Sequence, residues 1–125
     1  MPSITNFSFP FVIQTLRIIA TGADAAVFSI SNRCNFTIWP GILAGAGKAQ
    51  LMDGGFELEP GYSVNIQAPQ GWSGRFWARI GCKFGSFGQG SCVTGDCGGL
   101  LRCGGAGGQP PASLAEFTVD SPIDY

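Results

Sequence analysis

The chain has 125 residues, of which 45% are hydrophobic and 12% are charged, and its formal net charge at pH 7 is −1. This composition predicts one folded domain, and the near-neutral charge excludes the clustered basic surface that nucleic acid or anionic lipid would require. Histidine is absent, which excludes Ser-His-Asp and Cys-His nucleophilic sites and every His-ligated metal site, so we expect no metal and no cofactor.

Residues 1–25 are predicted to be a signal peptide. An apolar run from Phe7 to Ala20 precedes Ala23-Asp24-Ala25, a small-x-small pattern of the kind that signal peptidase cleaves after. No Lys or Arg precedes the run, and Gln14 and Arg17 interrupt it, so a mis-assigned start or a disordered tail is the alternative. The run is too short for a membrane span. We expect a mature domain over residues 26–125.

From residue 27 onwards the chain shows the period-two alternation of half-buried strands. Phe28 and Ile30 share one face, and Ser29 and Ser31 share the other. No repeat and no long amphipathic helix accompanies this pattern, so the sequence predicts an all-β domain. The predicted strands run from Val27 towards Cys34 and over Phe36–Trp39, Ala49–Met52, Phe56–Glu59, Tyr62–Gln67, Arg75–Ile80 and Leu114–Val119.

Two proline–glycine pairs are predicted to separate these strands. Pro40-Gly41 is expected to end the strand Phe36–Trp39 in a turn, because proline fixes φ and glycine leaves it free. Pro60-Gly61 is expected to join Phe56–Glu59 and Tyr62–Gln67 as a hairpin.

Asn35 begins the sequon Asn35-Phe36-Thr37. In a secreted chain this tripeptide is an acceptor for N-glycosylation. Strand residues are poor acceptors, so the alternatives are a glycan on Asn35 and an asparagine that is simply exposed to solvent.

The strand Arg75–Ile80 places two cations and an aromatic ring on one face. Arg75, Trp77 and Arg79 alternate with apolar residues that face the core. A solvated face with Trp77 between arginine stems is the plain interpretation. A Trp–Arg stripe can also stack on sugar rings and donate hydrogen bonds to hydroxyls, so Trp77 and Arg79 are candidate binding residues.

Four of the five cysteines lie within residues 82–103, and no C-x-x-C pair occurs. This spacing favours a disulfide framework over a metal or redox site. Proximity favours the pairs Cys82–Cys92 and Cys97–Cys103. Glycines between them permit the tight reversals that closely spaced bridges need. Asp96 is interpreted as a turn residue whose carboxylate caps local amides.

The cysteine-rich segment resembles the signature of thaumatin-like proteins, the plant pathogenesis-related group 5 family. The matching motif is Gly88-x-Gly90-x-Cys92-x-Thr94-Gly95-Asp96-Cys97-Gly98-Gly99-x-x-x-Cys103. The likeness continues in Phe28-Ser-Ile-Ser-Asn-Arg-Cys34, Thr37-Ile-Trp39-Pro-Gly, Gly74-Arg75-Phe-Trp77-Ala-Arg79-Ile-Gly-Cys82 and Pro110-Pro111-Ala-Ser-Leu-Ala-Glu116-Phe. It implies a thaumatin-like β-sandwich (flattened barrel) with stapled loops, represented by its N-terminal portion and incomplete at the C-terminus.

The resemblance also implies disulfides, a site and a function. It implies the same two cysteine pairs and leaves Cys34 outside both, since the family partner of that cysteine would lie past Tyr125. Arg75 and Glu116 match the arginine and glutamate of the family's acidic cleft, whose three aspartates would also lie past Tyr125. The implied function is host defence: a secreted protein of the apoplast or vacuole that binds fungal-wall β-1,3-glucan, with antifungal activity. A fungal membrane or receptor is a further implied partner, and the full-length protein is implied to be a monomer.

Two alternatives remain open beside the glucan-binding interpretation. A full-length form would act as a weak endo-β-1,3-glucanase, or the chain is a truncated fragment without independent activity. Glycoside hydrolysis ordinarily needs two carboxylates flanking the scissile bond, and Glu116 is only one. A nearby Arg75 would also favour an ionised Glu116 that binds hydroxyls over an acid that donates a proton. The sequence therefore favours binding over catalysis.

Overall fold

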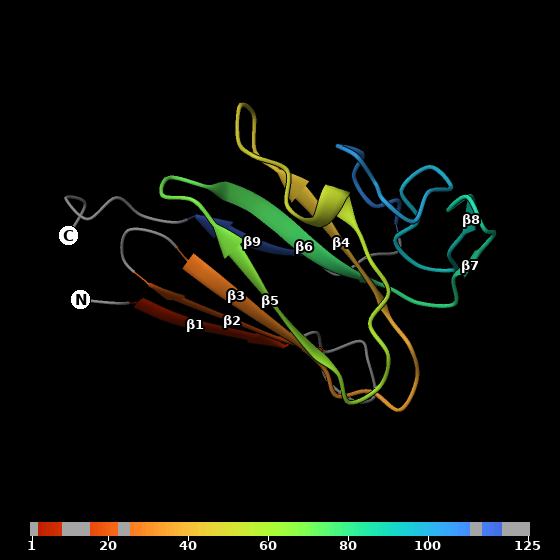
Figure 1. Cartoon of the computed structure of the whole chain (residues 1–125), viewed down its shortest axis with the longest axis horizontal. Coiled ribbons are helices and arrows are strands. Elements are labelled where there is room, and N and C mark those ends of the chain that lie inside the picture. Colours follow the sequence, from red (N-terminus) through yellow and green to blue (C-terminus); the bar gives the residue numbers. More distant parts are fainter. Residues whose placement is uncertain (1–2, 9–15, 23–25, 111–113, 119–125) are drawn as a thin grey trace.

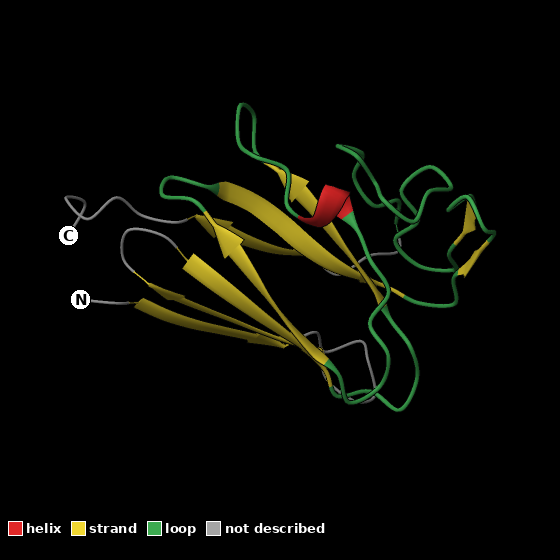
Figure 2. Ribbon diagram, viewed as in Figure 1, coloured by secondary structure: helices red, strands yellow, loops and turns green. Residues whose placement is uncertain are grey.

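Antiparallel strands form almost all of the regular structure in this computed structural model (Figures 1 and 2). The structure describes residues 3–8, 16–22, 26–110 and 114–118. Within these ranges the single helical element is the 3-10 turn η1 (Met52–Gly54), which confirms the all-β prediction. The strands are β1 (Ser3–Ser8), β2 (Leu16–Gly22), β3 (Ala26–Asn32), β4 (Trp39–Ala44), β5 (Ser63–Ala68), β6 (Ser73–Arg79), β7 (Lys83–Phe84), β8 (Gly90–Ser91) and β9 (Leu114–Thr118).

Two sheets make up the body of the domain. One has the order β1-β2-β3-β5 and the other has the order β4-β6-β9, while β7 and β8 form a short ribbon in the disulfide loop at the far end of the molecule (Figure 1). None of the helices in the described part of the chain is long and apolar enough to cross a membrane.

The core lies where the inner faces of the two sheets meet. Phe28 of β3 contacts Phe76 of β6 with ring centroids 4.9 Å apart, and Trp72 contacts both rings at 5.6 and 5.9 Å. Trp72 is fully buried and satisfies its indole N–H by donating to the Ala49 carbonyl oxygen at 2.8 Å. The alternation that predicted Phe28, Ile30 and Phe76 as inward-facing residues is therefore confirmed.

The predicted turn at Pro40-Gly41 is wrong, because both residues lie inside β4 and pair with Ala78 and Trp77 of β6. A Cβ atom on Gly41 would lie 2.4 Å from a ring carbon of Trp77. Gly41 therefore serves a close side-chain approach rather than a chain reversal.

The predicted hairpin across Pro60-Gly61 is also wrong. Residues 63–68 form β5, which pairs with β3 in a register that places Ile66 opposite Phe28. Leu58 instead bridges Ile38, which precedes β4. The segment between Leu58 and β5 thus crosses from one sheet to the other.

Strands β1 and β2 lie within residues 1–25, for which the sequence predicts a signal peptide. In this structure β2 pairs with β3, from Leu16 opposite Asn32 to Thr21 opposite Val27. Cleavage after Ala25 would remove both strands and leave β3 at the edge of its sheet. The signal peptide stays a prediction.

Candidate functional site

The predicted exposed stripe on β6 is wrong for two of its three residues. Trp77 and Arg79 are both 0% exposed, whereas Arg75 is partly exposed. The loop that carries the four clustered cysteines folds back over this face of β6 and covers both side chains. Trp77 and Arg79 are therefore removed from any surface at which a polysaccharide could bind.

Arg79 joins β6 to β4 and to the disulfide loop. Its guanidinium donates to the carbonyl oxygens of Trp39, Leu100 and Leu101 at 2.8 Å each and of Pro40 at 3.2 Å. Burial lowers the pKa of Arg79 to about 10, against an opposing effect of the Asp96 charge, so the group is charged at neutral pH. Main-chain carbonyls are its direct partners, which indicates a structural role.

The disulfide loop has the predicted pairing. Cys82–Cys92 and Cys97–Cys103 are both formed, with Cα atoms 3.9 and 5.6 Å apart. Cys34 lies outside both bridges, is 4% exposed, and has a thiol whose pKa is raised by burial.

Asp96 caps the backbone between the two bridges, as predicted. Its carboxylate accepts from the amides of Cys92 at 3.0 Å, Gly98 at 3.2 Å and Gly99 at 3.0 Å. These bonds use both oxygens within the loop. Among the described residues, no group of three or more Cys, Asp or Glu side chains is placed to hold a metal ion.

Arg75 and Glu116 come together on the three-stranded sheet. The register places Arg75 of β6 directly opposite Glu116 of β9 and, on its other side, opposite Leu43 of β4. Both residues line an open pocket of about 220 Å³. Glu116 is exposed, and the one ion pair between described residues is elsewhere, at Arg102 and Asp53. Arg75 and Glu116 thus line the same pocket, and no salt bridge joins them across it.

Ser73 and Gly45 complete the floor of this pocket and were not anticipated from the sequence. The Gly45 amide donates to the Ser73 carbonyl oxygen at 2.7 Å. A Cβ atom on Gly45 would lie 2.5 Å from the Ser73 hydroxyl oxygen, so a larger residue would fill the space beside it. Ser73 is two residues before Arg75 on the same strand, and residues with this spacing share one face of a sheet, so the sequence could have indicated that Ser73 lies beside Arg75. The remaining lining residues are Leu43, Ala44 and Gly74.

The pocket offers complementary hydrogen-bonding groups over a short distance. A guanidinium supplies donors only and a carboxylate supplies acceptors only, while a serine hydroxyl supplies both. A ligand rich in hydroxyl groups can satisfy all three. Glu116 is the one carboxylate among the described residues that line the pocket, whereas acid–base hydrolysis of a glycoside ordinarily uses a pair.

Asn35 lies in an exposed bend between β3 and β4, and this bend includes Phe36, the first residue of the predicted strand Phe36–Trp39. An exposed loop position is accessible to a glycosyltransferase. In a secreting eukaryotic host we expect a glycan at Asn35, seen as a mobility shift that endoglycosidase treatment reverses. Thr37→Ala should abolish the shift, and an identical shift in Thr37→Ala and wild type would contradict the prediction.

Comparisons with known proteins extend over most of the chain. Residues 32–124 match the model of the Thaumatin family. The chain is 51% identical over 123 residues to "Thaumatin-like protein 1" of Arabidopsis thaliana, an alignment that covers 94% of this chain and 47% of that protein. It is 55% identical over 109 residues to "Pathogenesis-related protein 5" of the same plant, with 87% and 42% covered.

A solved structure of a thaumatin-like protein also resembles this chain in its fold. The thaumatin-like xylanase inhibitor TLXI superimposes with a TM-score of 0.63 at 41% identity, over 74% of this chain and 60% of the inhibitor. The sandwich fold is therefore shared with a thaumatin-like protein. The chain spans about half the length of the curated relatives it matches.

Proposed function

Since the chain belongs to the thaumatin family, we propose that it is a plant defence protein that binds fungal-wall β-1,3-glucan through the Arg75–Glu116 pocket. Relatives named as pathogenesis-related proteins, which are 55% and 56% identical to it, support the defence role. Antifungal activity would follow from attachment to the wall. Arg75 and Glu116 match the arginine and the glutamate that the resemblance places in the acidic cleft of thaumatin-like proteins.

One observation carries the binding proposal: Arg75 and Glu116 stand opposite each other on neighbouring strands and share a pocket without an ion pair between them. Open space between an arginine and a carboxylate can admit sugar hydroxyls, which accept from the guanidinium and donate to the carboxylate. Because both residues lie on paired strands, their backbone is already ordered before binding, and the entropy lost on binding is that of the two side chains.

Secretion to the apoplast or vacuole forms part of the same proposal. Two disulfides within the described residues suit an oxidising compartment, since cytosolic thiols are kept reduced.

Sedimentation with insoluble β-1,3-glucan tests the binding site. We expect Arg75→Ala and Glu116→Gln each to raise the dissociation constant on the order of tenfold, because each removes a charge-assisted hydrogen bond. Arg102→Ala is the matched control, since Arg102 is an arginine with a side chain 72% exposed outside the pocket. Equal retention of all three variants and the wild type would overturn the proposal.

Release of reducing sugar in the same tubes separates a binder from a glucanase. We expect retention without release, since Glu116 is the one carboxylate that the described part of the chain contributes to the pocket. Release that Glu116→Gln abolishes would instead support the weak glucanase.

A further inference from the structure

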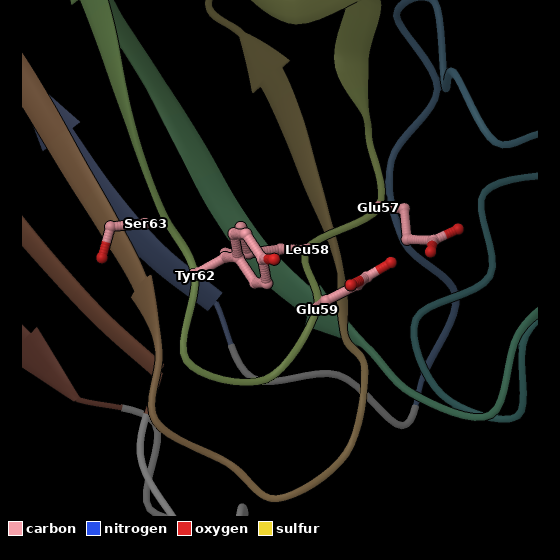
Figure 3. Close-up of a pocket in the computed structure, with 5 residues that line it drawn as sticks. All are labelled: Glu57, Leu58, Glu59, Tyr62 and Ser63. Atoms are coloured by element: carbon pink, nitrogen blue, oxygen red, sulfur yellow. The ribbon is translucent and has the colours of Figure 1, made fainter.

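A second pocket lies where residues 57–59 cross towards β5. It has a volume of about 370 Å³ and is lined by Glu57, Leu58, Glu59, Tyr62 and Ser63. It shares no lining residue with the Arg75–Glu116 pocket. In Figure 3 the two glutamate side chains point to the same side of the chain, and Tyr62 lies between them and Ser63.

The buried side chain of Asn32 holds this pocket in shape. Its amide nitrogen donates to the carbonyl oxygens of Leu58 and Phe36 at 2.9 Å each, and its amide oxygen accepts from the Cys34 amide at 2.8 Å. Asn32 is 1% exposed, so each of these bonds is protected from competing water. The segment that carries both glutamates is thereby fixed to β3.

Tyr62 is presented to solvent from a fixed backbone. Its amide donates to the Glu59 carbonyl oxygen at 3.1 Å, and its own carbonyl accepts from the Asn32 amide at 2.9 Å. The residue is nevertheless 62% exposed, although aromatic side chains are usually buried. An exposed aromatic ring on an anchored backbone can serve as a platform for the apolar face of a sugar or for an ammonium group.

The charge of the pocket is uncompensated. Glu57 and Glu59 are both exposed carboxylates, and no lysine or arginine is among the lining residues. The ion pair between Arg102 and Asp53, the one found in the described part of the chain, does not involve either glutamate. A positively charged ligand would therefore be favoured over a neutral one.

We infer that this pocket binds the protonated amino sugar of a polysaccharide, such as the glucosamine unit of a deacetylated wall polymer. The pyranose ring packs on Tyr62, and its ammonium group pairs with the carboxylates of Glu57 and Glu59. The remaining sugar hydroxyls bond to these carboxylates and to the Tyr62 hydroxyl. A lysine-rich peptide would use the carboxylates but would leave the ring face without a matching flat partner.

Calorimetry with the whole chain tests the inference. The probes are three hexasaccharides (β-1,4-linked glucosamine, its N-acetylated form and a neutral β-1,3-glucan) and hexalysine. We expect the glucosamine hexamer to bind at least tenfold more tightly than each of the other three, with an affinity that falls as salt is added.

Variants test whether binding occurs at this pocket and distinguish specific binding from non-specific attraction of a polycation. Glu57→Gln with Glu59→Gln should weaken glucosamine binding on the order of tenfold or more. Tyr62→Ala should weaken it several-fold although it changes no charge, while Tyr62→Phe keeps the ring and most of the affinity. Asp53→Asn removes one exposed negative charge outside both pockets and should leave this affinity unchanged.

Three outcomes would overturn the inference: equal binding of the acetylated hexamer, equal or tighter binding of hexalysine, or unchanged affinity in Tyr62→Ala. The first would remove the role of charge, the second would indicate a peptide site, and the third would indicate diffuse electrostatics. None depends on glucan sedimentation, because the two pockets have separate residues and separate variants.

Discussion

Arg79→Met should lower the free energy of unfolding by about 3–5 kcal/mol. The substitution removes one donor from each of four main-chain carbonyls, those of Trp39, Pro40, Leu100 and Leu101, of which Pro40 keeps the Phe56 amide. Methionine also removes the cost of burying a charge, which works in the opposite direction. The loss dominates, because methionine has no donor for these carbonyl oxygens and the fully buried position of Arg79 leaves little room for water to take the place of the guanidinium. The urea midpoint of the oxidised protein is the measurement.

Arg75→Met is the matched control for this experiment. Arg75 lies on the same strand and is the same residue type, but it is only partly buried, so its replacement should cost less than about 1 kcal/mol. Arg79→Lys keeps the charge and should still be clearly destabilising, because one ammonium group cannot reach carbonyls on β4 and in the loop at once. Equal stability of Arg79→Met and Arg75→Met would show that the loop is held by other contacts.

Trp77→Ala has the second large effect that we expect, also about 3–5 kcal/mol. The ring is 0% exposed and packs with Cys97 and Cys103, and its indole N–H donates to the Gly95 carbonyl oxygen at 2.8 Å. Glycines surround it: a Cβ atom on Gly41 or Gly108 would lie within 2.6 Å of a ring atom. Glycines have no side chains that could move into the vacated space, so the cavity would persist.

The loop itself provides the second measurement for Trp77→Ala. Cys97 and Cys103 are 1% and 3% exposed, which protects their bridge from a reductant. Loss of the ring should loosen the loop and speed reduction of this bridge more than that of Cys82–Cys92. Trp77→Phe keeps a ring and should fall between wild type and alanine. Reduction rates that do not change in Trp77→Ala would contradict a packing role for the ring.

These two predictions concern a part of the fold that the sequence described incompletely. The alternation over residues 75–80 correctly placed Phe76 and Ala78 on the core side. The same alternation assigned Trp77 and Arg79 to the other face, and this assignment suggested a binding stripe. A period of two reports which face a residue occupies and does not report whether another segment covers that face.

The turn predicted at residues 40 and 41 failed for a related reason, whereas residues 60 and 61 do form a turn. Proline and glycine at residues 40 and 41 are typical of a turn, but Gly41 is needed where the Trp77 ring crosses the strand. The hairpin expected at residues 60 and 61 depended on which strand would be the partner of β5. Asn32 and the apolar face of β3 decided that pairing, and both are far from β5 in the sequence.

Local features were determined by the amino-acid sequence alone. Period-two alternation predicted the strands that became β3, β5, β6 and β9, and proximity along the chain favoured the two cysteine pairs, separated by 10 and 6 residues, that the structure contains. The tertiary structure alone decided that the disulfide loop lies on β6, that Arg75 faces Glu116 on neighbouring strands, and that Tyr62 is bonded to Asn32 of β3. These three arrangements bring together segments with no local sequence relation, and their geometry depends on the packing of the whole domain.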